Sequence, residues 1–452
     1  MAANGSETPT PRLRRVLTVW DLIFYGIVLI MPIAPVPIFG IAQSLSRGHF
    51  VTTILIAMLA MIFTAISYGR MAALYPTAGS AYTYVGRGLN PHLGFVTGWA
   101  MFLDYLIQPL LNGIFVALTV KRLIPQLPYA VLAAIFVGIM TGLNLRGIRT
   151  TARANVVLLS VVSIVIVAFI LLAVRYLFHF QGWGGLFSSQ PFYNPKTFDA
   201  RTIWTATSFA ALTYIGFDGV TTLAEDVENP KRNVMVATVA VCLFTGIVGG
   251  LEVYLAQRIW PDWTTFPNLE TAFLDVTRRV GGPLLFQGLG LVLILCCVGA
   301  GMTGQVGAAR LLFGMGRDNA LPRRFFAYLD PKLNTPTRNI WLIGIVAYIG
   351  TQLITFEEAG EILNFGAFLA FMGVNLATFW QFAVAPPAGR KRRLLSDVVM
   401  PLVGFLFCLW IWLGLKTPAK IVGGSWLLLG LTYSAIKTRG FRTHPVMIDV
   451  EG

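Results

Sequence analysis

Long runs of uncharged residues, separated by short charged segments, dominate the pattern of hydrophobic and polar positions along the chain. The first two runs contain 25 residues between Asp21 and Arg47 and 22 residues between Arg47 and Arg70. Because roughly 20 apolar residues in a helix cross the core of a bilayer, each run predicts a membrane-spanning helix. The pattern predicts an all-α integral membrane protein. Its twelve predicted spans lie at about 19–44, 51–74, 92–119, 129–146, 154–176, 202–224, 233–257, 283–316, 339–356, 360–384, 398–415 and 420–436.

Two of the predicted spans contain residues that interrupt helices. The first carries Pro32, Pro35 and Pro37, and the sixth carries Gly216 and Gly219 inside an apolar run. Proline removes a backbone donor and disfavours helical geometry at the preceding residue. Breaks in spans one and six occupy equivalent places in two halves of five spans, which predicts the inverted repeat of a secondary transporter. Kinks in two ordinary membrane helices are the alternative interpretation.

Composition excludes a soluble protein. Hydrophobic residues make up 56% of the 452 positions and charged residues only 12%, about half the usual share. The formal net charge is +14, and the larger share of the 34 Lys and Arg residues falls on one side of the predicted membrane. Such an asymmetry predicts that both termini face the cytoplasm and that the cations contact anionic lipid rather than nucleic acid. No phosphate loop or metal-binding spacing occurs, so we expect no cofactor, no metal and no enzyme activity.

Two acids interrupt the apolar spans. Asp104 lies near the middle of the third span, and Asp218 follows the break in the sixth. A carboxylate at the bilayer centre costs roughly 2.5–3.5 kcal/mol on insertion scales, so Asp104 is expected to face the interior and meet a cation, a proton or hydrogen-bond donors. Asp218 has two equally supported roles, in the substrate or coupling site or as a cap on the second half of its helix.

Three segments resemble the signatures of the amino acid–polyamine–organocation transporters. They are AGSAYTY at 78–84 after Pro76, YIGFD at 214–218 followed by Glu225 and NPKR at 229–232, and ARLLFGMGRD at 309–318. Within this family, the LDYL segment at 103–106 and GFDGVTTL at 216–223 are most similar to the bacterial putrescine-importer branch. The similarity covers nearly the whole chain.

The resemblance implies a LeuT-like fold of two inverted repeats of five helices. The implied organisation is an N-terminal cytoplasmic tail at 1–18, a transport core at 19–384 with repeats at 19–176 and 202–384, peripheral helices at 398–436 and a C-terminal cytoplasmic tail at 437–452.

The resemblance also implies which residues contact the substrate, from the broken spans and from span three. They are Met31, Pro32, Ile33, Ala34, Pro35, Asp104, Tyr105, Gln108, Asn112, Tyr214, Ile215, Gly216, Phe217 and Asp218. The residues implied in coupling or gating are Asp104, Asp218, Glu225 and Thr303. Relatives that bind amino acids present the N–H groups of a glycine-rich turn to the substrate carboxylate. Pro32 and Pro35 would remove two such donors.

The sequence therefore predicts a transporter of the inner membrane that imports a small organic cation such as putrescine by alternating access. Asp104 is the expected counter-ion, and proton coupling through Asp104 or Asp218 is preferred over sodium coupling or exchange. An L-amino acid transporter or exchanger of the same fold is the alternative. We expect a small amine or amino acid, protons and membrane lipid as partners, and neither nucleic acid nor an obligate protein partner.

Overall fold

The computed structural model describes residues 17–76, 80–146, 152–224, 226–317, 321–333, 335–386 and 389–442, without the side chains of 152–155. These residues form helices and no strand. The α-helices are α1 (Val19–Ile30), α2 (Phe39–Leu45), α3 (Phe50–Leu74), α4 (Ser80–Gly88), α5 (Pro91–Leu123), α6 (Tyr129–Leu145), α7 (Ala152–Leu186), α8 (Ala200–Ala210), α9 (Pro230–Ile259), α10 (Ala272–Arg317), α11 (Arg323–Phe326), α12 (Thr337–Leu353), α13 (Phe356–Phe379), α14 (Met400–Gly414) and α15 (Thr417–Lys437). Shorter helical turns are η1 (Ala211–Tyr214), η2 (Phe217–Leu223), η3 (Trp263–Thr265), η4 (Trp380–Val384) and η5 (Leu394–Val399).

Eight helices in the described part of the chain are long and apolar enough to cross a membrane. The four other predicted spans are shorter or interrupted. Helices α6 and α12 have 17 residues each, and the first and sixth spans are divided into α1 and α2 and into α8, η1 and η2. The chain is thus a multi-pass membrane protein whose long helices fall where the uncharged runs predict them.

Two predicted spans belong to longer helices in the structure, and one short helix was not predicted. Helix α10 begins at Ala272, but Gly282, where φ is 62°, interrupts its helical geometry, so the part of α10 after this bend begins where the predicted span does. Helix α7 continues to Leu186, ten residues beyond its predicted end, across a similar bend at Gly182. The short helix α4 was not predicted. Charged residues end the uncharged runs without ending the helices, which explains the first two differences.

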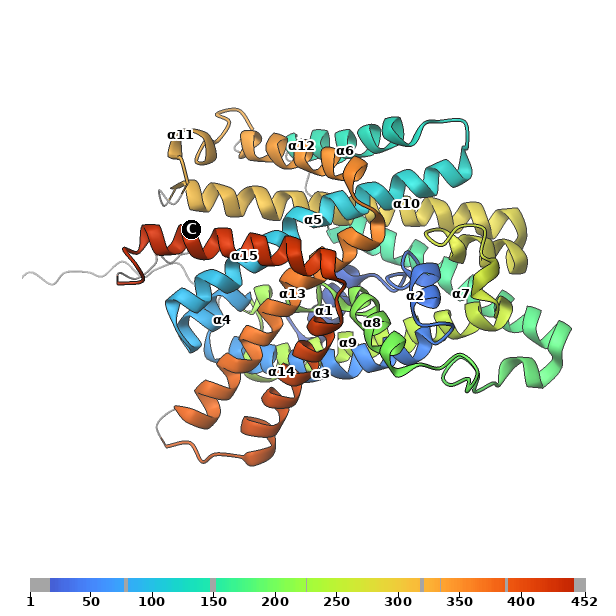
Figure 1. Cartoon of the computed structure of the whole chain (residues 1–452), viewed down its shortest axis with the longest axis horizontal. Coiled ribbons are helices and arrows are strands. Elements are labelled where there is room, and N and C mark those ends of the chain that lie inside the picture. The colour runs from blue at the N-terminus through green and yellow to red at the C-terminus, as the bar shows by residue number, and fades with distance from the viewer. Residues whose placement is uncertain are drawn as a thin grey trace, which may run out of the picture.

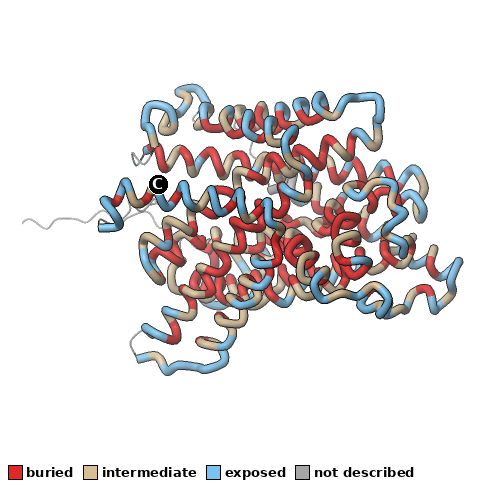
Figure 2. The backbone as a smooth tube through the Cα atoms, viewed as in Figure 1, coloured by how far each residue is buried: buried red, intermediate tan, exposed pale blue. Residues whose placement is uncertain are grey.

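The core of the molecule is formed by α5 and α13 and by the two broken spans. Helix α5 packs along α10 and α13, and α3 packs along α9. In Figure 1, α1, α8 and α13 lie near the centre of the view, with α6 and α12 along one edge and α14 towards the opposite one. Buried positions gather at this centre, and the outer faces of α12 and α15 are exposed (Figure 2). The broken spans therefore lie inside the helix bundle.

Candidate functional site

The first span is interrupted where its prolines occur. Helix α1 ends at Ile30, and its C-cap Met31 has a positive φ of 64°. The chain then follows tight turns, in which Ala34 N–H donates to the carbonyl of Met31 at 3.1 Å, until α2 begins at Phe39. Because Pro32 has no N–H, it cannot continue the hydrogen bonding of α1. The predicted break is confirmed.

The sixth span is interrupted at its glycine. Helix α8 gives way to η1, and Ile215 then adopts an extended conformation with ψ of 130°. Gly216 follows with φ of 106°, a left-handed conformation that is open to glycine and strained for other residues. The turns of η2 begin at Phe217. The second predicted break is therefore also confirmed.

The two breaks meet in space. A Cβ atom placed on Gly216 would lie 3.9 Å from both the carbonyl oxygen of Leu29 and the Cγ1 atom of Ile30, and one on Gly219 would lie 2.7 Å from the Cδ1 atom of Leu29. Sequence reasoning predicted the two breaks separately. Their direct contact makes one region of non-helical backbone at the centre of the bundle, where such backbone lies only if it is buried in protein or lines a cavity.

The last carbonyl groups of α1 accept no backbone hydrogen bond from the described residues. In the part of the chain that the structure describes, no N–H beyond the end of α1 donates to the carbonyls of Val28, Leu29 or Ile30, whereas Met31 N–H donates to Ile27. These carbonyls form the negative end of the helix dipole. The end of α1 can therefore stabilise a positively charged group.

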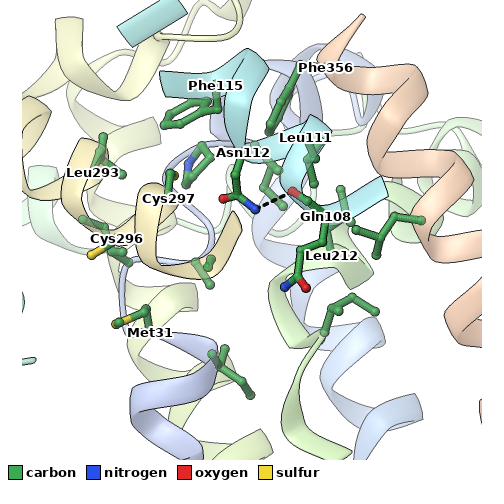
Figure 3. Close-up of a pocket in the computed structure, with 18 of the residues that line it drawn as sticks. Met31, Gln108, Leu111, Asn112, Phe115, Leu212, Leu293, Cys296, Cys297 and Phe356 are labelled. Carbon is green, nitrogen blue, oxygen red and sulfur yellow. Dashed lines mark hydrogen bonds between the residues drawn. The ribbon is translucent and has the colours of Figure 1, made fainter. Parts of the chain in front are cut away.

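A pocket of about 150 Å³ lies beside the two breaks. Its walls come from the α1 break, α5, α10, α13 and the η1 turn (Figure 3). The lining is mostly apolar, and its polar side chains are Gln108 and Asn112. Asn112 Nδ2 donates to the carbonyl of Gln108 at 2.8 Å, while no described protein group hydrogen-bonds the side-chain amide of Gln108. This amide can bind a small ligand.

The pocket face of α5 packs on a row of glycines in α10. Gly301 faces Asn112, Gly304 faces Gln108, and a Cβ on Gly304 would lie 2.5 Å from the Gln108 Oε1 atom. Gly307 faces Tyr105 in the same way. Small residues allow helix backbones to approach closely in membranes. The glycines of α10 thus set the position of three residues that the sequence predicted for the site.

Asp104 and Asp218 do not line this pocket, although each lies within four residues of a lining residue, Gln108 and Ile215. Asp104 precedes Gln108 by one helical turn and therefore shares its face of α5. The two carboxylates lie within electrostatic range of each other and of Tyr105. Both acids are partly accessible, and in the described chain neither forms a salt bridge. Two acids without a protein cation produce a site that favours a positively charged ligand.

Aromatic rings cover the Asp218 side of the site. The rings of Tyr68 and Phe217 make an edge contact with centroids 5.4 Å apart, and Tyr68 also contacts Tyr84 at 6.0 Å. The Tyr68 hydroxyl is buried without a hydrogen-bond partner among the described residues. Neither Tyr68 nor Tyr84 was predicted for the site. Tyr68 is an aromatic residue within an apolar span and gives no contrast in the sequence, and Tyr84 belongs to α4, a helix that was not predicted.

Other predicted site residues lie away from the pocket. Tyr214 is buried, and its hydroxyl donates to the carbonyl of Ile54 at 2.8 Å. Pro35 packs against Gly249 of α9: a Cβ atom placed on Gly249 would lie 3.0 Å from the Pro35 ring. Thr303 is exposed and donates to the carbonyl of Gly299. Glu225 lies outside the described residues.

Three of the residues that were predicted for the site in the first span do line the pocket. They are Met31, Ile33 and Ala34.

Most of the pocket wall was not predicted. Apart from Pro37, which was predicted only to interrupt the first span, the additional residues have apolar or sulfur-containing side chains. In a single sequence such side chains cannot be distinguished from lipid-facing neighbours. They are Leu29, Ile30, Pro37, Ile38, Leu111, Phe115, Leu212, Leu293, Cys296, Cys297, Ala300, Phe356 and Leu363.

Comparisons with known proteins find a family of permeases and several transporters. The profile of the family described as "Amino acid permease" matches residues 17–438. The chain is 32% identical over 97% of both chains to the low-affinity putrescine importer PlaP of Escherichia coli strain K12. It is 27% identical to the methylthioribose transporter of Bacillus subtilis, over 94% of both chains. It is 25% identical to the branched-chain amino acid permease BcaP of the same species, over 97% of this chain and 96% of the permease.

Proposed function

Because the chain belongs to the amino acid permease family, we propose that it imports a small organic cation, a putrescine-like amine or polyamine, across the inner membrane. The observation that carries this proposal is the pair of acids beside the pocket, which has no protein cation in the described chain. An ammonium group of the substrate would neutralise a carboxylate that is costly to leave charged at the centre of a membrane.

The end of α1 supports the same substrate class. The unused carbonyls of Leu29 and Ile30 accept hydrogen bonds from an ammonium, which has donors only. Proline at position 32 offers no N–H to a carboxylate. The 32% identity to a putrescine importer is consistent with an amine substrate.

Alternating access is the proposed mechanism, on a LeuT-like frame of two repeats of five helices. The packing of α5 on α10 and of α3 on α9 pairs the third span with the eighth and the second with the seventh. Those are the pairs that an inverted repeat relates. Both termini are proposed to lie in the cytoplasm, as the distribution of Lys and Arg favours. Proton coupling is proposed through Asp104 or Asp218, the partly accessible acids of spans three and six.

An L-amino acid transporter of the same fold is the second candidate. The largely apolar pocket wall, with Leu111, Leu293 and Phe356, favours it, since such walls bind aliphatic side chains. The relative BcaP is a branched-chain amino acid permease. In that case Asp104 would be protonated and Asp218 would cap η2.

Uptake by purified protein in liposomes tests the proposal. We expect accumulation of labelled putrescine, and at least a 30-fold loss in Asp104→Asn, because removal of one partner of a desolvated charge pair costs about 2 kcal/mol or more. Glu228→Gln is the matched control, since this acid is exposed near the end of the sixth span. Putrescine uptake that is unchanged in Asp104→Asn would remove this acid from the mechanism. Uptake of leucine but not of putrescine would establish the second candidate.

A further inference from the structure

A second cavity of about 940 Å³ lies far from the pocket at the breaks, as a groove between the last turns of α3 and the first half of α9. Its third wall is formed by Phe382 and by the segment that leads into α14. The groove shares no residue with the pocket at the breaks. It is therefore a separate feature of the protein.

One end of the groove is positively charged. Its lining contains Arg70, Lys231, Arg390 and Arg393. Behind them, the buried carboxylate of Asp397 accepts hydrogen bonds from Arg70 at 2.5 Å and from Arg390 at 3.0 Å. Two of the four cations thus pair with Asp397, and the side chains of Lys231 and Arg393 form no salt bridge within the described chain.

The two paired arginines are held rigidly. Arg70 and Arg390 both stack on the ring of Phe382, with their guanidinium carbons 4.0 and 4.4 Å from its centroid. Asp397 also accepts from the backbone N–H of Arg393 at 2.8 Å. The positive end of the groove is therefore preorganised.

The rest of the groove is apolar and open to the surroundings. Val236 is 41% exposed and Leu243 37% exposed, and both line the groove. From Lys231 to Leu243 the helix rises roughly 18 Å, at 1.5 Å per residue. This length is close to the ~15 Å depth of one leaflet of the hydrocarbon core. The other apolar lining residues are Ile66, Ala73, Leu74, Met235, Val239, Ala240 and Met400.

We propose that this groove binds an anionic glycerophospholipid, with its phosphate at the four cations and an acyl chain along α9. The end of α3 and the start of α9 lie on the same side of the membrane, which is the cytoplasmic side in the proposed orientation. Basic pockets between membrane helices on that side bind anionic headgroups. A free phosphate would use the cations but not the apolar wall, whereas a lipid uses both.

Stability of the purified protein in detergent tests this site with added phosphatidylglycerol, phosphatidylcholine and inorganic phosphate. Phosphatidylglycerol is expected to raise the apparent melting temperature in a saturable way, and the other two are not. In the double variant Lys231→Gln/Arg393→Gln, the apparent affinity for phosphatidylglycerol is expected to fall about 30-fold. Each cation near the membrane surface raises the affinity for an anionic lipid about fivefold. Arg323→Gln/Arg324→Gln is the matched control, with two exposed cations of α11 on the same predicted side.

Three results would overturn the proposal. One is equal binding of phosphatidylglycerol by the groove variant and the control. Another is equal stabilisation by inorganic phosphate, which would establish an anion site without a lipid. The third concerns Ala240→Trp, which fills the apolar part of the groove without a change of charge: unaltered lipid affinity in this folded variant would exclude an acyl chain along α9.

Discussion

The carboxylates of Asp104 and Asp218 lie within electrostatic range of each other, although one belongs to α5 and the other to the first turn of η2. This arrangement depends on the break in the sixth span. In a continuous helix the chain would not turn at Gly216, and Asp218 would lie at a different place. The contact between Gly216 and Leu29 places the end of α1 at the same location. Three elements that are distant in sequence therefore contribute negative potential to one site.

Both acids should be required for amine transport, with different consequences for stability. Asp104→Asn is expected to abolish putrescine uptake and to leave the apparent melting temperature almost unchanged. Asp218→Asn is expected to lose uptake and also to lower the melting temperature slightly, because Asp218 lies in the first turn of η2, where a negative charge complements the helix dipole. Uptake and thermal unfolding of both variants check this. A stable Asp218→Asn protein with normal uptake would contradict both roles of Asp218.

The cysteines of α10 report on the pocket. Cys296 and Cys297 line it, whereas Cys242 and Cys408 are fully buried elsewhere. In single-cysteine variants, a small methanethiosulfonate reagent is expected to label position 297 and not position 242 or 408. Putrescine should slow the labelling severalfold, because the substrate occupies the same space. Mass spectrometry of the labelled protein measures this. Labelling of Cys297 at the same rate with saturating putrescine would place the substrate outside the pocket.

Close packing of α13 on α5 should be sensitive to a single methyl group. A Cβ on Gly366 would lie 2.4 Å from the carbonyl oxygen of Ala100, a backbone atom that cannot move aside. Gly366→Ala is expected to destabilise the protein by about 1–3 kcal/mol, the usual cost of overpacking. Gly424→Ala is the control, because nothing lies within 4 Å of its Cβ position in α15. Equal melting temperatures for the two variants would contradict this packing.

Helix α15 is attached to α5 by two tryptophans. Trp99 Nε1 donates to the carbonyl of Trp426 at 2.8 Å, Trp426 Nε1 donates to the carbonyl of Trp99 at 2.9 Å, and the rings stack 4.7 Å apart. Trp426→Phe removes one of these hydrogen bonds and is expected to lower stability by about 1 kcal/mol. Trp341→Phe, on an exposed face of α12, should have a smaller effect. Thermal unfolding in detergent compares the two, and a larger loss in the α12 variant would refute the attachment.

The sequence predicted those parts of the fold and site in which a residue contrasts with its surroundings. Prolines in an apolar run indicated the break after Ile30, and a glycine in an apolar run indicated the break at Gly216. An acid in an apolar span indicated Asp104, whose part in the site stays a prediction. Leu293 and Phe356 could not be found in this way, because a pocket wall and a lipid-facing surface are both apolar. The hydroxyl of Thr303 also contrasts with its neighbours, but it lies on an exposed face of α10, and its role in coupling stays a prediction.

Ligand binding by the purified protein tests the central claim most directly. Thermal unfolding would be followed with putrescine, a monoamine of similar length and neutral L-amino acids, each added in excess. A ligand that binds only the folded state stabilises it by about 2.7 kcal/mol at a hundred times its dissociation constant. The account predicts saturable stabilisation by putrescine that is absent in Asp104→Asn, and none by leucine. Stabilisation by leucine alone would contradict the account and establish an amino acid transporter.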